Sequence, residues 1–234
     1  MRNRNYFGPM MVETGEADGI LNGLTQSYPD TIRPMLHTIG TKPGIRVAGI
    51  YMMIFKSRVM FFADTTVNVG MNANDIALVA IETADMAAKY LQTAPRVAML
   101  SYSNFGSAPT TSSVMMKEAV AIAKQKRPDL IIDGEMQVEP AIDEKIAGEF
   151  FPFSKIQGDA NVLIFPNLSS ANISYKLLQR LGGAEAIGPI LVGMNKPVNV
   201  IPTGADVQDV VNMATFTSIA IQNAKDQQKV LGNT

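Results

Sequence analysis

The chain has 234 residues, of which 47% are hydrophobic and 18% charged, and this composition predicts a globular protein with one large core or two small ones. A net charge of −1 offers no basic field to nucleic acid or to an anionic membrane, and the absence of cysteine excludes disulfides, thiolate metal sites and cysteine nucleophiles. The single histidine, His37, argues against a histidine metal cluster or a Ser-His-Asp triad. We therefore expect a cytoplasmic protein that binds neither nucleic acid nor membrane and holds no metal.

Hydrophobic periodicity predicts strands and helices in alternation. Residues 44–55 and 58–63 are predicted to form an antiparallel hairpin around Lys56-Ser57, at the edge of a sheet. The later predicted elements are a helix over 74–92, a strand over 97–101, a helix over 112–125, a strand over 130–133, a helix over 139–147, a strand over 161–165, a helix over 170–181, a strand over 186–192 and a helix over 207–229. This order predicts an α/β fold, with a mainly parallel sheet covered by helices on both faces.

Ligands of such sheets bind in loops at the carboxyl ends of the strands, and the first such loop covers residues 101–111. It combines small hydroxyl side chains with Gly106, which can supply hydrogen-bond donors to an anion such as a phosphate, or to a pantetheine carbonyl. The alternative is that Ser112 or Ser113 caps the next helix while the rest is solvated loop. The pattern favours neither role.

Two further loops offer polar side chains at helix starts. In residues 165–175, Ser169, Ser170 and Asn172 can cap the next helix or bind a ligand, and the pattern favours capping. In residues 196–209, Asp206 and Asp209 fit the positive end of the last helix, and a general base at Asp209 is the alternative.

A fourth polar cluster lies near the amino terminus, in residues 18–33. The Arg33 guanidinium can pair with Asp30 or present two parallel donors to a phosphate, and the pattern alone favours a salt-bridged surface group.

Several long blocks in register carry a resemblance to a known family; among them are TIRPMLHTIGTKPG, FADTTVN, RVAMLSYSNFGSA, IDGEMQVEPAID and KPVNVIPTGADVQD. In order and spacing they resemble the phosphotransacetylases, which exchange acetyl groups between coenzyme A and phosphate. The resemblance implies a two-domain α/β architecture, like that of isocitrate and isopropylmalate dehydrogenases. It places residues 39–198 in the second domain and residues 1–38 and 199–234 in a first domain that lacks its remaining strands. Because the family's chain begins well before Met1, we expect a chain truncated at its amino end.

The same resemblance implies site residues. Asp209 matches the family's catalytic aspartate, and the positions expected to bind the ligand are Ser27, Thr31, Arg33, Ser103, Asn104, Gly106, Ser107, Asn172, Tyr175, Asn199 and Thr203. Pro202 and Thr203 stand where the family carries a Ser-Arg pair, and Phe105 replaces a lysine. Losing a charged donor from a preorganised site costs about 2.7–4 kcal/mol, so the departures predict a pocket that binds acetyl-CoA but transfers acetyl groups poorly.

A narrower resemblance rests on RNRNYFGPMMVE, LSYSNFGSA and VGMNKPVNV. These segments are similar to the phosphotransacetylase-like domain of long bacterial malic enzymes, whose amino-terminal domains use NADP and a divalent metal. It implies a regulatory domain with no cofactor of its own, which binds acetyl-CoA as effector and forms a homodimer or higher homo-oligomer beside the malic-enzyme domains. The alternatives are an active phosphate acetyltransferase using Asp209 and Arg33, or an oligomerisation scaffold without a ligand.

Overall fold

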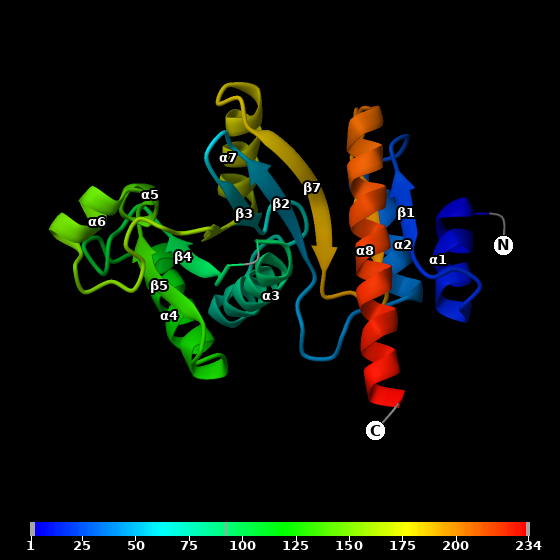
Figure 1. Cartoon of the computed structure of the whole chain (residues 1–234), viewed down its shortest axis with the longest axis horizontal. Helices are drawn as coiled ribbons and strands as arrows, with labels where there is room; N and C mark the ends of the chain where they lie inside the picture. The colour runs from blue at the N-terminus through cyan, green and yellow to red at the C-terminus, as the bar shows by residue number, and fades with distance from the viewer. Residues whose placement is uncertain (1–2, 92, 233–234) are drawn as a thin grey trace. The chain divides into compact units, whose positions relative to one another are not determined.

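One six-stranded sheet organises residues 48–186 in the computed structural model, which describes residues 3–91 and 93–232 (Figure 1). Its strand order is β5-β4-β6-β3-β2-β7. The elements are β2 (Ala48–Ile54), β3 (Val59–Ala63), α3 (Ala73–Leu91), β4 (Arg96–Leu100), α4 (Thr111–Lys126), β5 (Ile131–Met136), α5 (Val138–Ile142), α6 (Glu144–Phe150), β6 (Val162–Ile164), α7 (Leu168–Arg180) and β7 (Glu185–Val192). The pairs β3–β6, β4–β6 and β4–β5 are parallel, whereas β2–β3 is antiparallel. The predicted α/β fold with a mainly parallel sheet is confirmed.

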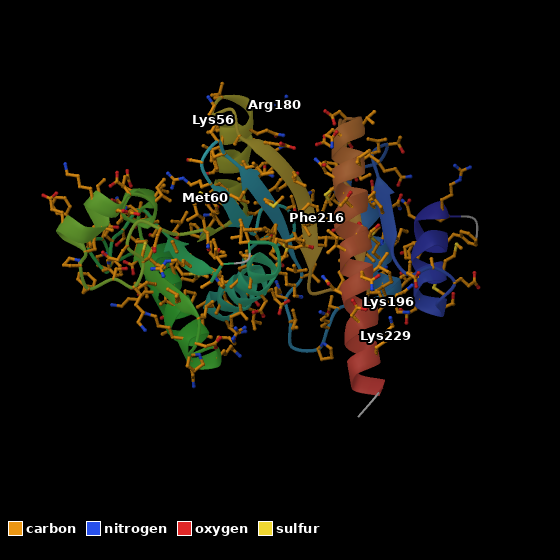
Figure 2. The ribbon with its side chains drawn as sticks, in the orientation of Figure 1. Lys56, Met60, Arg180, Lys196, Phe216 and Lys229 are labelled. Atoms are coloured by element: carbon orange, nitrogen blue, oxygen red, sulfur yellow. The ribbon has the colours of Figure 1, made fainter. Side chains whose placement is uncertain are left out.

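Alternating side chains of this sheet build a core on each face. Met60 and Phe62 of β3 belong to a buried cluster that includes Ala171 and Tyr175 of α7, and Figure 2 labels Met60 on its strand. Phe61, between them in the sequence, is fully buried and points to the other face. Because α3 packs on β3, β4 and β6, the sheet is covered on both faces.

A buried carboxylate turns the chain after β3. Asp64 is 0% exposed, and its Oδ1 accepts hydrogen bonds from the backbone N–H groups of Gly49 (3.0 Å), Thr66 (3.1 Å) and Val67 (3.2 Å). Its Oδ2 accepts from the backbone N–H of Asn68 (2.7 Å) and from the Asn68 side-chain amide (2.5 Å). A carboxylate with these donors costs little to bury, and it fixes the loop at the carboxyl end of the strand.

The first unit consists of Met1–Val47 and Ile187–Thr234, and the second of Ala48–Ala186. In the first unit, β1 (Ile20–Gly23) pairs in parallel with β8 (Val198–Ile201), beside α1 (Arg4–Thr14), α2 (Tyr28–Thr38) and α8 (Val207–Gly232). The strands approach so closely at Gly23 that a Cβ there would lie 2.2 Å from the Ile201 carbonyl oxygen. Phe216 of α8, labelled in Figure 2, contributes to the buried side chains of this unit.

Lys196 joins the end of α1 to the segment before β8. Its ammonium donates to the carbonyl oxygens of Val12 (2.8 Å) and Glu13 (2.9 Å), and Figure 2 labels this residue. These carbonyls belong to the last turn of α1, where backbone acceptors lack partners within the helix and a cation is favourable.

The predicted hairpin of β2 and β3 is confirmed, but its predicted edge position is wrong, because β6 and β7 flank it. The predicted single helix over 139–147 is wrong as well. Asp143 adopts an extended conformation that ends α5, and its carboxylate caps α6 by accepting from the N–H groups of Lys145 and Ile146. The helix predicted over 74–92 appears as α3, and Gln92 lies outside the described residues.

The two units have boundaries after Val47 and before Ile187, whereas the resemblance implied boundaries at 38/39 and 198/199. The strand β7 begins in the second unit and ends in the first, so its residues are shared. Over the residues that the structure describes, no helix has the length and apolar character needed to cross a membrane.

A second buried acid, Asp133, holds the segment after α6. Its carboxylate accepts hydrogen bonds from the Lys124 ammonium (2.9 Å), the Lys155 N–H (2.9 Å) and the Ser154 hydroxyl (3.0 Å). Burial alone would raise the pKa of Asp133, but these donors outweigh burial and lower the pKa below its usual range.

Substitution of Asp64 tests the turn after β3. In Asp64→Asn, whichever way the amide lies, its NH₂ group faces N–H donors that now need an acceptor. We expect the free energy of unfolding to fall by about 3 kcal/mol or more in urea titrations. The exposed helix residue Glu118 gives the control, since Glu118→Gln should change stability by less than about 0.5 kcal/mol. A loss no larger in Asp64→Asn than in the control would contradict the assigned role.

Acid titration tests the ion pair of Asp133. A group whose pKa is lowered by folding stabilises the native state above its unfolded pKa of about 3.9, and this stabilisation is lost as pH falls through the lower, folded value. We expect Asp133→Asn to lose about 1–2 kcal/mol near pH 7, with the two stability curves converging toward about pH 3. Urea unfolding across this range measures the difference. Parallel curves for the variant and the wild type would show that the pKa shift is not linked to folding.

Candidate active site

The loop between β4 and α4, residues 101–110, uses its hydroxyl groups internally. Ser103 is 0% exposed; its Oγ donates to Glu135 Oε1 (2.9 Å) and accepts from the Ala108 N–H (3.0 Å). Ser107 Oγ accepts from the Asn104 N–H at 2.9 Å. Both serines were predicted as ligand donors, and the structure places them in the hydrogen bonds that shape the loop.

The glycine of this loop also binds an acid of the protein. Phe105 and Gly106 have φ angles of +48° and +90°, so two successive residues are left-handed. Gly106 donates its N–H to Glu135 Oε1 at 2.6 Å, and Phe105 donates its N–H to the Glu135 carbonyl oxygen at 2.8 Å. The Glu135 carboxylate thus binds one backbone N–H of the loop, that of Gly106, in addition to the Ser103 hydroxyl. The sequence had not singled out Glu135.

Asn104 ties the loop to the residue that follows β5. Its Oδ1 accepts from the Gln137 N–H (2.7 Å), and its Nδ2 donates to Gln137 Oε1 (2.8 Å). The Gln137 side chain donates in turn to the Tyr102 carbonyl oxygen at 2.7 Å. Loop and strand end are therefore held by both side-chain and backbone contacts.

The loop before α7 places its predicted residues in structural contacts. Asn167 caps the helix, since its Oδ1 accepts from the Ser170 N–H at 2.9 Å. Asn172 donates its side-chain amide to the Thr65 carbonyl oxygen (3.1 Å), and Tyr175 is 5% exposed and stacks on Tyr51 with ring centroids 4.0 Å apart. The capping role favoured for this loop is filled by an asparagine that pattern reasoning had passed over.

In the first unit, Ser27 caps α2. Its Oγ accepts from the Asp30 N–H (3.3 Å) and donates to the Asp30 carboxylate (2.5 Å), while Thr31 is buried with its hydroxyl on the Ser27 carbonyl oxygen (3.1 Å). Asp30 is thus held by the cap and makes no ion pair with Arg33. The Arg33 side chain is exposed, and within residues 3–91 and 93–232 its guanidinium has no hydrogen-bond or ion-pair partner.

The start of α8 carries the remaining predicted residues. Asp209 Oδ2 accepts from the Asp206 N–H (3.0 Å), and Asp206 Oδ1 accepts from the Asp209 N–H (2.9 Å), which is a reciprocal cap. Thr203 donates its hydroxyl to the Gln26 carbonyl oxygen at 3.0 Å, so the segment before α8 lies against the residue that precedes the cap of α2.

Asn199 has a structural place within the first unit. It is 3% exposed, accepts from the Leu191 N–H (2.8 Å) and donates to the Thr217 hydroxyl (2.9 Å). These contacts bind β8 to β7 and α8. In the part of the chain that the structure describes, no group of three or more His, Cys, Asp or Glu side chains has an arrangement that fits a metal ion.

Comparisons with known proteins identify the class. The chain matches the family described as Phosphate acetyl/butaryl transferase over residues 1–218. A phosphate acetyltransferase of Bacillus subtilis (strain 168) is 44% identical over 217 residues, which cover 92% of this chain and 67% of that protein. The chain belongs to the phosphate acetyl/butyryl transferase family, and it spans about two thirds of the length of this relative.

Solved structures agree with this assignment. The EutD phosphotransacetylase from Staphylococcus aureus has a TM-score of 0.84 and 43% identity, covering 93% of this chain and 67% of that one. A phosphotransacetylase from Streptococcus pyogenes has a TM-score of 0.88 and 42% identity, covering 94% and 67%.

These relatives correct the functional prediction. The chain was expected to be the regulatory domain of a malic enzyme, with NADP and oxidoreductase chemistry in partner domains. That prediction is wrong, because relatives more than 40% identical are phosphate acetyltransferases. The departures at Pro202 and Thr203 had been given more weight than the similarity of the whole chain.

Proposed function

We propose that the chain has phosphate acetyltransferase activity and exchanges an acetyl group between coenzyme A and inorganic phosphate. Acetyl-CoA is then a substrate, where the sequence had suggested an effector. The observation that carries the proposal is the exposed guanidinium of Arg33, which has no partner among the residues that the structure describes, while the carboxylate of Asp30 is held by Ser27. A guanidinium without an internal partner can present two parallel N–H donors to a phosphate.

The hydrogen bond from Thr203 to Gln26 connects the segments that lead into α2 and α8. The carboxylates at these helix starts are held within the caps, Asp30 by Ser27, and Asp206 and Asp209 by each other's N–H groups. The family's Ser-Arg pair is replaced here by Pro202 and Thr203, so we assign the phosphate charge to Arg33.

The reaction balances without a cofactor. An oxygen of hydrogen phosphate attacks the thioester carbonyl carbon, the carbon–sulfur bond breaks, and acetyl phosphate and the coenzyme A thiolate form. The proton lost by hydrogen phosphate is taken up by the thiolate. We assign its relay to Asp209: Oδ2 accepts from the Asp206 N–H, while Oδ1 has no hydrogen-bond partner among the described residues.

In the second unit we assign the exposed side of loop 101–110 to coenzyme A. Tyr102, Gly106 and Ser107 are exposed there, while Ser103 and Glu135 lie beneath them. This loop follows β4 at the carboxyl edge of the parallel strands, where ligands of α/β sheets bind.

Substitution of Arg33 tests the proposal. We expect Arg33→Ala to lower kcat/KM for phosphate on the order of 100-fold, because a charged donor to the substrate is lost. The rate of acetyl phosphate formation from acetyl-CoA at varied phosphate concentration measures kcat/KM. The matched control is Arg4→Ala, another exposed arginine of the first unit, which should leave kcat/KM unchanged.

Two results would contradict the proposal. A wild-type chain that forms no acetyl phosphate would overturn the activity, and absence of saturable acetyl-CoA binding in calorimetry would then favour the oligomerisation scaffold. If the wild type is active and Arg33→Ala keeps a kcat/KM for phosphate within threefold of the wild-type value, only the role of Arg33 is overturned.

A gain of activity provides a second test. Thr203→Arg restores the cation that the family carries at this position, next to the residue before the cap of α2. We expect kcat/KM for phosphate to rise about tenfold or more, since one added charged donor contributes a few kcal/mol. Thr203→Gln, which adds length without charge, is the control. Equal behaviour of the two variants would show that the charge has no effect here.

A further inference from the structure

Glu135 is a buried acid whose charge has no cationic partner. It lies on β5 and is 1% exposed. Oε1 accepts from the Ser103 hydroxyl and the Gly106 N–H, whereas Oε2 is buried and accepts no hydrogen bond among the described residues. No lysine or arginine of the described chain pairs with it.

Such a placement is costly for the fold. Burying a carboxylate with an unsatisfied oxygen disfavours the native state, and an apolar residue of similar size is often at least as stable at such a position. Half-satisfied buried polar groups in native proteins therefore call for an explanation beyond stability.

The donors that bind Glu135 come from one short loop. Ser103 and Gly106 reach Oε1, and the Phe105 N–H reaches the Glu135 carbonyl oxygen, all within four residues of the chain. Phe105 keeps its left-handed conformation while its ring packs on Phe151 and Phe153, with centroids 5.5 and 4.9 Å away. The carboxylate thus binds the loop from inside through one hydroxyl and one backbone N–H, and the ring contacts hold the strained Phe105 in place.

The opposite side of the same residues is open. Tyr102 is 54% exposed, and Gly106 and Ser107 are exposed as well. Two peptide units of the loop are oriented from the inner side, because the N–H groups of Phe105 and Gly106 donate to the carbonyl oxygen and to the carboxylate of Glu135.

We propose that Glu135 is a positioning residue, which sets the outer surface of loop 101–110 for coenzyme A without touching the substrate. The proposal rests on the function assigned above. It predicts that the acid affects recognition of acetyl-CoA and leaves recognition of phosphate, assigned to Arg33 in the other unit, unchanged.

The kinetic experiment compares Glu135→Ala, Glu135→Gln and the control Glu139→Gln, whose carboxyl is exposed on α5. Glu135→Ala removes the acceptor, so we expect KM for acetyl-CoA to rise about tenfold, while KM for phosphate stays within about twofold. Glu135→Gln keeps one acceptor oxygen for Ser103 and Gly106 and should recover most of the loss. The control should match the wild type.

A second readout does not need activity. Hydrogen exchange of a peptide covering residues 101–110 should be slow in the wild type and in Glu135→Gln, and faster in Glu135→Ala, because the Gly106 N–H loses its acceptor. Calorimetry with coenzyme A should show affinity falling in step with this exchange.

The outcomes separate the two proposals. An inactive wild type overturns the acetyltransferase assignment, while exchange and coenzyme A binding still test Glu135. Unchanged exchange in Glu135→Ala, or an equal rise of KM for both substrates with a general loss of stability, overturns the positioning role. If Glu135→Ala does not fold, the double variant Glu135→Gln, Ser103→Ala takes its place. A KM for acetyl-CoA and a hydrogen-exchange rate equal to those of the wild type in this double variant would overturn the positioning role.

Discussion

In the second unit, the buried carboxylate of Asp64 fixes the end of β3 and the loop that follows it. It lies where β3, the strand with an antiparallel neighbour on one side and a parallel neighbour on the other, gives way to the loop that leads into α3. Donors from Gly49 and from residues 66–68 converge on it, so the end of the hairpin and the next loop share one acceptor. Asp64, Glu135 and Asp133 all bind N–H groups of the chain itself, and each of these buried acids fixes the backbone of a loop or segment beside its strand.

This use of internal anions separates the predicted site residues into two kinds. Ser103, Ser107, Asn172 and Asn199 were predicted as ligand donors, yet each has its hydrogen bonds committed within the fold. Arg33 differs, since its exposed guanidinium has no partner among the described residues. The proposed phosphate site therefore rests on Arg33, and the proposed coenzyme A site on the exposed side of loop 101–110.

Sequence reasoning succeeded where a pattern repeats and failed where a contact spans the chain. The helix α3 was predicted because apolar residues, among them Ile76, Val79 and Ala80, recur at helical spacing. In the structure all three are buried. By contrast β1, of four half-buried residues, pairs with β8 far along the chain, and no local pattern marks either strand. Glu135 was missed because a single acid after a glycine has no periodicity. The functional error had another source: two substituted positions were weighed above the similarity of the chain around them.

The pairing of β1 with β8, and the hydrogen bonds from Lys196 to the end of α1, also limit the order in which the chain can fold during its synthesis. The first unit is split, with 139 residues of the second unit, Ala48 to Ala186, inserted between its halves. During translation β1 and the end of α1 leave the ribosome long before β8 and Lys196 are synthesised, whereas β2 pairs with β3, and β4 with β5, soon after each pair has been made. These two pairs are therefore able to form before the first unit is complete. Until β8 is made, β1 lacks its hydrogen-bonding partner, and its free backbone N–H and C=O groups are open to pairing with another chain.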